Sequence, residues 1–223
     1  QHCRSVLDGL DEAERVITNL QSKPHGKIKL TAPVTYGEQH IMPLVNDFAK
    51  IYGDVEVFAH LSNLKVDLVE EGYDLAIRLG KLSDSSMMAK KLSKRTNYVC
   101  ASPAYLNQHG IPHSLSELSK HSCLLGTIDH WRFRESDKEK SIRVTGRLRY
   151  NSGQGLVDAA LKGLGIVQLP DYYVEHYLQS GELVTLLDNY QVPDEGIWVI
   201  YPQNRHLSPK IRLLVDYLAE QLL

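Results

Sequence analysis

The chain has 223 residues, of which 43% are hydrophobic, and its formal net charge is -2. This length and composition suffice for one large domain or two small ones with proper cores, and the nearly neutral charge gives no electrostatic footprint for nucleic acid. No apolar run approaches the roughly 20 residues that span a bilayer, and no signal segment opens the chain, so we expect a soluble, cytoplasmic protein without a membrane partner.

The cysteines and the first residues of the chain bear on its context. Cys3, Cys100 and Cys123 are an odd number without metal-like spacing, which fits a reducing compartment better than a disulfide framework. The chain opens with Gln1 and His2 rather than Met, so we expect an upstream portion to be missing.

Residues 3–20 carry apolar side chains at alternating spacings of three and four. This a/d pattern is typical of a helix that packs along another helix, although an ordinary surface helix on its own domain fits so short a run equally well. The segment Ser22–Gly26 then breaks the helix and predicts a linker.

The stretch Lys27–His40 reads as a short apolar strand that ends at Ala32, a polar turn at Pro33–Gly37, and the start of a helix. In open α/β sheets ligands bind outside the carboxyl ends of strands, where a helix N-terminus also points. The turn Pro33–Gly37 is therefore the first candidate for a binding site.

Alternating strands and helices continue beyond this point. A strand at Val55–Ala59 is followed by a predicted short helix at Leu64–Glu71, which Gly72 ends, and by a strand at Tyr73–Gly80. This order predicts a doubly wound α/β unit with a parallel sheet.

A polar span, Ser83–Lys94, leads to further elements that predict a second α/β unit. Helices are expected after Ser102, which a proline follows, after a capping box at Ser114–Glu117, and after Ser208. The remaining elements are strands at 98–101, 123–127, 183–187 and 197–201, a hairpin at 131–145, and helices at 153–162 and 171–179. The stretch Gly163–Pro170 reads as a helix stop, a buried strand and a proline at the strand end. The two units are expected to be joined by two crossovers, near Ala101-Ser102 and Tyr201-Pro202.

The sequence shows few features of a catalytic or cofactor-binding site. The histidines and cysteines lack zinc-ligand spacing, and the glycines form no phosphate-binding loop, so we expect no metal and no cofactor. Cys100 is either a nucleophile beside a turn or a small buried hydrophobe whose apolar surroundings raise the thiol pKa. The second interpretation is favoured, and the chain is not predicted to be an enzyme.

A binding function needs only residues at strand ends, where hydroxyl groups and helix-start amides dominate. Such residues suit a small polar or anionic ligand. Arg78 could pair with a ligand carboxylate, although an arginine at a strand end also serves in structural salt bridges. The candidates are Pro33, Thr35, Tyr36, Gly37, Ser62, Arg78 and Gly80 on one wall, and Ser102, Thr127, Asn151, Ser152, Val167 and Leu169 on the other.

The order and spacing of several motifs resemble those of the effector-binding part of bacterial LysR-type transcriptional regulators. The matching stretches span nearly the whole chain and are Gly26–Pro33, Met42-Pro43, Val66–Gly80, Cys100–Leu106, His109–Pro112 and Gly163–Pro170. The resemblance implies a fold like that of periplasmic binding proteins, with an effector cleft between two subdomains.

The resemblance also implies the organisation of the longer protein. Residues 1–23 look like the end of a linker helix, residues 27–101 with 203–223 like subdomain I, and residues 102–202 like subdomain II. A DNA-reading domain would precede this chain and contact promoter DNA, and the protein would pair with itself as a homodimer and a tetramer at full length. The runner-up function is a stand-alone small-solute-binding protein of the same fold.

Hinge and dimer residues follow from the same resemblance. The hinge matches Ala101, Ser102, Pro103, Tyr201 and Pro202. Tyr36 replaces the small hydroxyl residue often seen in the effector loop of the family, so it is expected to influence which ligand fits. The predicted dimer interface pairs apolar faces of two helices and a strand at Ile41, Leu44, Phe48, Val55, Val57, Leu156 and Ala160.

Overall fold

A computed structural model describes residues 24–82, 87–203 and 207–222. The predicted linker helix at residues 3–20 and Cys3 lie outside the described residues. Within them, the chain forms two compact units: unit 1 holds the residues up to Ser93 and from Gly196 onward, and unit 2 holds Lys94–Glu195.

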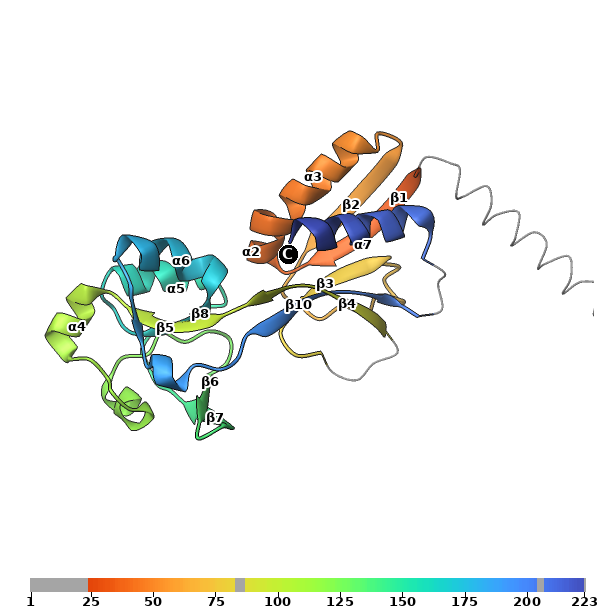
Figure 1. The fold of residues 1–223 in the computed structure, drawn as a ribbon. Helices are drawn as coiled ribbons and strands as arrows, with labels where there is room; N and C mark the ends of the chain where they lie inside the picture. Colours follow the sequence, from red (N-terminus) through yellow and green to blue (C-terminus); the bar gives the residue numbers. More distant parts are fainter. Residues whose placement is uncertain (1–23, 83–86, 204–206, 223) are drawn as a thin grey trace, which may run out of the picture. The chain divides into compact units, whose positions relative to one another are not determined.

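Unit 1 is built on a five-stranded sheet with the strand order β2-β1-β3-β10-β4. The strands β1, β2 and β3 are parallel to one another, whereas β10 runs antiparallel to β3. Helices α3 and α7 lie side by side over one face of the sheet (Figure 1), where the rings of Phe48 and Tyr217 are 5.7 Å apart. The strands are β1 (Gly26–Ala32), β2 (Val55–Leu61), β3 (Leu75–Leu79), β4 (Met87–Arg95) and β10 (Glu195–Pro202), and the helices are α2 (Val34–Tyr36), a π-helical turn (Gly37–Ile41), α3 (Met42–Ile51) and α7 (Pro209–Gln221).

Unit 2 has its own sheet, in which β5 lies between β8 and β9 and is antiparallel to both. Parallel bridges join Cys123 to Ile166 and Leu125 to Arg149, and helices α5 and α6 pack beside β5 and β8 (Figure 1). The strands are β5 (Asn97–Ala101), β6 (His130–Glu135), β7 (Lys138–Arg143), β8 (Val167–Pro170) and β9 (Val184–Leu186), and the helices are α4 (Pro103–His109), α5 (Gly153–Leu161), α6 (Asp171–Ser180) and two short 3-10 helices (Leu115–Lys120 and Asp188–Tyr190).

Local signals in the sequence account for several of these elements. The Ser102 hydroxyl accepts a hydrogen bond from the Tyr105 amide at the start of α4, and the Ser152 hydroxyl does the same for Gly155 in α5. Gly181 ends α6 with a φ of 78°, a left-handed conformation that favours glycine. The predicted hairpin is also present, as the paired strands β6 and β7.

Two predicted elements are wrong, and a third has different end contacts. Pro33–Gly37 is not a polar turn, because Pro33 directly precedes a continuous helical stretch that runs from Val34 to Ile51. Leu64–Glu71 is not a helix, since it forms bends and turns in which the Asp67 carboxylate accepts the amides of Val69 and Glu70. The short helix expected after Ser114 is present as the 3-10 helix Leu115–Lys120, but its capping box does not form, because the Ser114 hydroxyl makes no cap bond and the Glu117 carboxylate accepts the amide of His113 instead of that of Ser114.

The boundary between the units also differs from the predicted one. The chain crosses at Ser93-Lys94 and at Glu195-Gly196, because β5 pairs with β8 and β9 and therefore belongs to unit 2. The predicted hinge residues consequently lie inside the units, with Ala101, Ser102 and Pro103 in unit 2 and Tyr201 and Pro202 in unit 1.

The residues predicted for a dimer interface are mostly core residues of their own unit. In unit 1, Ile41 and Phe48 are fully buried, and Val55 is 7% exposed. In unit 2, Leu156 and Ala160 belong to a buried cluster between α5 and β8. Leu44 and Val57 are half-buried, and the pairing of two chains through these helices stays a prediction.

Candidate functional site

A hollow of about 880 Å³ lies in unit 1, within the usual range for sites that hold small ligands. The parallel strands β1, β2 and β3 bring their carboxyl ends to one edge of the sheet, and the hollow is lined from that edge and from the neighbouring strands β4 and β10. Its lining consists of Pro33, Ser62, Asn63, Leu64, Lys65, Val66, Asp67, Leu68, Arg78, Leu79, Lys81, Leu82, Met87, Ala89 and Ile200.

Hydrogen bonds hold the strand ends at this edge together. The Ser62 amide donates to the Ala32 carbonyl at 2.9 Å, and the Val34 amide donates to the Asn63 side-chain oxygen at 3.1 Å. The Ser62 hydroxyl accepts the Leu64 amide at 3.2 Å. These bonds join the start of the first helix to the segment that follows β2, and so position the wall of the hollow.

Arg78 is the half-buried cation of the hollow. Burial lowers the pKa of its guanidinium, since removal from water disfavours the charged form. Among the residues that the structure describes, no carboxylate forms an ion pair with Arg78 or accepts a hydrogen bond from it. Its hydrogen-bond donors are therefore available to a ligand in the hollow.

The charges around Arg78 have an excess of positive sign. Lys65 and Lys81 also line the hollow, and Asp67 is the one acidic residue among its described lining. The Oδ1 atom of Asp67 accepts the amides of Val69 at 2.9 Å and Glu70 at 3.1 Å. This carboxylate is thus engaged in its own turn, and the hollow favours an anionic ligand.

An apolar cluster forms the other part of the lining. Leu68, Tyr73 and Ala76 are buried together, and Val66, Met87 and Ile200 pack against them. Ile200 pairs with Ala76 and Trp198 pairs with Arg78 across β10 and β3, so these four residues share one face of the sheet. A ligand in the hollow therefore meets Arg78 and an apolar floor on the same face.

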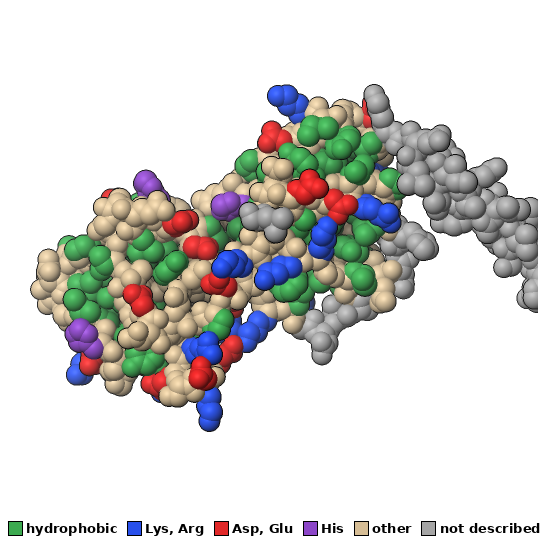
Figure 2. All heavy atoms as spheres, in the orientation of Figure 1, with side chains coloured by type: hydrophobic (Ala, Val, Ile, Leu, Met, Phe, Trp, Pro, Cys, Tyr) green, Lys and Arg blue, Asp and Glu red, His purple; other side chains and the backbone are tan. Residues whose placement is uncertain are grey.

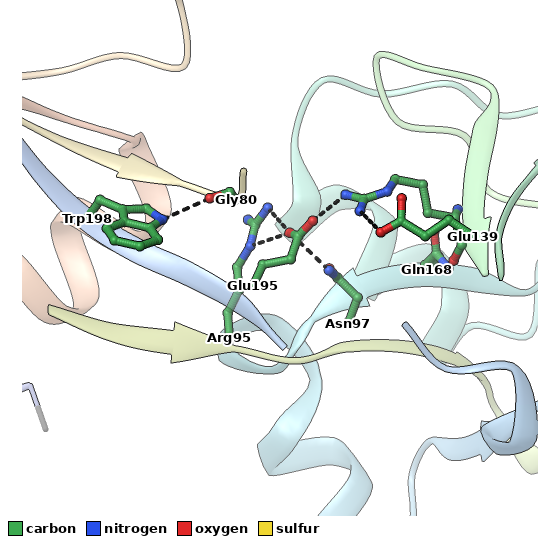
Figure 3. A network of polar contacts seen from close by, with 8 residues as sticks. Gly80, Arg95, Asn97, Glu139, Gln168, Glu195 and Trp198 are labelled. Atoms are coloured by element: carbon green, nitrogen blue, oxygen red, sulfur yellow. Dashed lines mark hydrogen bonds and ion pairs between the residues drawn. The ribbon is translucent and has the colours of Figure 1, made fainter. Parts of the chain in front are cut away.

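The structure brings together three of the predicted site residues of unit 1, Pro33, Ser62 and Arg78, as lining of the hollow. Thr35, Tyr36, Gly37 and Gly80 do not line it. Tyr36 is 4% exposed and stacks on His40 with ring centroids 4.6 Å apart, and a side chain at Gly37 would meet the Leu61 side chain at 2.6 Å. The carbonyl of Gly80 accepts the Trp198 indole N–H at 2.9 Å (Figure 3).

The predicted site residues of unit 2 are dispersed. Val167 and Leu169 are core residues, at 0% and 7% exposure, and Ser102 is 3% exposed as the cap of α4. Thr127, Asn151 and Ser152 are exposed. No hydrogen bond joins any two of these six residues among the interactions described for unit 2.

Sequence reasoning missed much of the hollow. Lys65, Val66 and Leu68 lie in the segment that was predicted as a helix, and Met87 and Ala89 lie on β4, for which no strand was predicted. The apolar residues Met87, Met88, Ala89 and Leu92 do not alternate with polar ones, so the sequence carried no periodic signal for this strand.

Unit 2 contains a network of paired charges around Glu195. The Glu195 carboxylate accepts hydrogen bonds from Arg95 at 2.7 and 3.0 Å and from Asn97 at 3.3 Å, and it also accepts one from Arg132 (Figure 3). The Glu195 side chain is only 4% exposed. Burial alone would raise the pKa of Glu195, but the hydrogen bonds and charges of Arg95 and Arg132 outweigh burial and lower it.

The remaining chemistry of the described residues gives no sign of a catalytic nucleophile. Burial raises the pKa of the Cys100 thiol to about 12, so it stays protonated, as the favoured interpretation of the sequence requires. Acidic and basic side chains are interspersed over the face shown in Figure 2, without a continuous basic field. No helix within residues 24–82, 87–203 and 207–222 is long and apolar enough to cross a membrane.

Comparison with known proteins gives a family and several relatives. Residues 21–223 match the family model described as LysR substrate binding domain. The transcriptional activator TtdR of Escherichia coli is 31% identical over 98% of this chain and 72% of TtdR, and an uncharacterised transcriptional regulator of Haemophilus influenzae is 33% identical over 95% of this chain and 75% of that protein.

Solved structures agree with these relatives. The full-length virulence activator AphB of Vibrio cholerae superposes with a TM-score of 0.80 at 28% identity, over 100% of this chain and 77% of AphB. The predicted fold class, two α/β subdomains with two crossovers as in periplasmic binding proteins, is confirmed by such regulatory domains. The relatives are named as transcriptional regulators, which form a non-enzymatic family, in agreement with the sequence analysis.

Proposed function

The chain belongs to the LysR substrate-binding domain family, and on that premise we propose that it senses a small metabolite and transmits its presence to DNA bound by the full-length regulator. The observation that carries the proposal is the hollow of unit 1, which combines strand ends, the Ser62 hydroxyl and an arginine without a described carboxylate partner. The runner-up function, a stand-alone solute-binding protein, is disfavoured because the relatives are transcriptional regulators.

In this proposal the chain is also the dimerisation part of the regulator. Homodimers form through the helices predicted from the sequence, and tetramers form at full length on promoter DNA. A ligand changes this assembly only if it has different affinities for two arrangements of the chains. Metabolite binding therefore alters the spacing of the dimers on DNA, and DNA contact itself belongs to a domain outside this chain.

A melting-temperature screen against a metabolite panel tests binding. We expect at least one small anionic metabolite to raise the melting temperature of the chain, because a ligand that binds only the folded state stabilises it. The variant Ser62→Leu should lose this response, since Ser62 lines the hollow. Ser141→Leu is the control, because Ser141 is an exposed residue of β7 in unit 2. A response that survives in Ser62→Leu would place the site elsewhere.

A footprinting assay tests transmission to DNA. The full-length regulator should protect a promoter segment whose length changes when the metabolite is added, whereas this chain alone should give no specific protection. An unchanged footprint at saturating metabolite would contradict the sensing role, and specific protection by the chain alone would contradict its assignment as the regulatory part.

A further inference from the structure

We propose that the hollow of unit 1 selects an amphipathic organic acid, whose carboxylate pairs with Arg78 while its apolar body lies on the floor formed by Val66, Leu68, Met87 and Ile200. The inference rests on the proposed sensing function and deepens it, because it names the chemical class of the ligand. It excludes sugars, bare inorganic anions and cationic metabolites as ligands of this hollow.

The surroundings of Arg78 indicate that the ligand carries a carboxylate head group. A half-buried guanidinium has lost part of its hydrogen bonding to water, and among the described residues no carboxylate accepts hydrogen bonds from Arg78 in place of that water. Lys65 adds positive charge to the lining, whereas Asp67 is engaged by the amides of its own turn. The planar guanidinium of an arginine can donate two parallel hydrogen bonds to one carboxylate. The ligand carboxylate therefore supplies the acceptor that Arg78 lacks among the described residues.

The apolar floor of the hollow indicates that the body of the ligand is also apolar. Val66, Met87 and Ile200 pack on the buried cluster of Leu68, Tyr73 and Ala76, so this part of the lining offers no charged group to a ligand. Leu64 and Leu82, also in the lining, are 75% and 39% exposed. Apolar surface of this kind gains about 25 cal/mol per Å² when a ligand covers it.

The size of the hollow separates this ligand from a simple anion. A volume of about 880 Å³ is far larger than acetate or phosphate needs, and ions of that size would leave the apolar floor in water. A molecule with only an apolar body would leave Arg78 without an acceptor. Only an acid with an extended apolar body contacts both Arg78 and the apolar floor.

Isothermal titration of the chain with four matched probes tests the proposal. Octanoate has both parts, octanol has only the body, acetate has only the head, and octylammonium carries the opposite charge. We expect saturable binding of octanoate at millimolar or lower concentration, at least about tenfold tighter than of the other three probes. Equal binding of octanoate and octanol, or the absence of octanoate binding up to about 10 mM, overturns the proposal.

Variants locate the binding on the named residues. Arg78→Gln should weaken octanoate about 10- to 100-fold while octanol is unchanged, and Arg78→Lys should fall between, because an ammonium lacks the planar fork. Met87→Gln should weaken octanoate and octanol together, since it places an amide in the floor. The controls are Arg212→Gln on α7 and Lys91→Gln on β4, which are exposed and outside the lining. Equal octanoate affinity in Arg78→Gln and Arg212→Gln would overturn the role of Arg78.

The outcome is separable from that of the sensing function. If octanoate binds as described but no acid in the panel changes the footprint of the full-length regulator, the ligand class stands and the sensing function fails. If a metabolite changes the footprint and Arg78→Gln leaves its affinity unaltered, the sensing function stands and the ligand class fails.

Discussion

Arg78 of unit 1 and Arg95 of unit 2 both lie at the ends of strands, but their surroundings differ. Arg95 donates two hydrogen bonds to Glu195, whose side chain is 4% exposed, and Asn97 and Arg132 complete the coordination of that carboxylate. Arg78 has no such acceptor among the described residues and faces a hollow. Removing one partner of a buried, fully paired charge is strongly destabilising, whereas a charge without partners is available for recognition.

The largest expected effect is the loss of the paired carboxylate in unit 2. Glu195→Ala should lower the free energy of unfolding by about 3–5 kcal/mol, because Arg95, whose side chain is 18% exposed, would lose its carboxylate partner. Urea unfolding followed by circular dichroism measures the change. Glu175→Ala on the exposed side of α6 is the control and should change stability by less than about 0.5 kcal/mol. A similar small change in Glu195→Ala would show that the network does not stabilise unit 2.

A smaller and pH-dependent loss is expected for Glu195→Gln, which keeps the side-chain volume. The pKa of Glu195 is lowered in the folded state, so its ionised form stabilises the fold above the unfolded pKa of about 4.3. That contribution is lost as the pH falls through the folded pKa. The variant should therefore be about 1.5–3 kcal/mol less stable at pH 7 and approach the parent below pH ~4. Urea midpoints at several pH values measure this, and a constant difference would exclude ionisation as the cause.

The contrast between the two units also shows what the sequence could predict. Strong periodicity and end signals predicted β1, β3, α5, α6 and α7, because their apolar spacing and their Ser or Gly ends are local properties. The acceptors of an arginine are not local. Arg95 and Glu195 are 100 residues apart in the chain, so the sequence could not tell that Arg95 is paired and Arg78 is not.

The same reasoning explains why only some of the predicted site residues line the hollow. Pro33, Ser62 and Arg78 were predicted from strand ends, and the parallel pairing of β1, β2 and β3 brings those ends to one edge. Val167 and Leu169 also lie on a strand, but α5 and α6 cover them as core residues. A strand-end rule identifies candidates without specifying which of them tertiary packing buries.

Helix capping gives a third comparison, within unit 2. Ser102→Ala should lower the free energy of unfolding by about 1 kcal/mol, since the Ser102 hydroxyl accepts the Tyr105 amide and is buried with it. Ser114→Ala is the matched control, because the Ser114 hydroxyl makes no cap bond, and its effect should stay below about 0.5 kcal/mol. Urea unfolding measures the free energy of unfolding of both variants. Equal losses in the two variants would contradict the difference between the Ser102 and Ser114 caps.

The smallest expected effect belongs to Arg78 and is the sharpest test of the comparison. Without ligand, Arg78→Gln should change the free energy of unfolding by no more than about 0.5 kcal/mol, and in the stabilising direction if at all. The reason is that burial disfavours its charge and no described carboxylate compensates, so removal of the charge relieves a cost of folding. The pKa of an arginine stays far above neutrality, so this result should not vary between pH 6 and pH 8. A loss above about 2 kcal/mol would instead mean that Arg78, like Arg95, serves a structural ion pair.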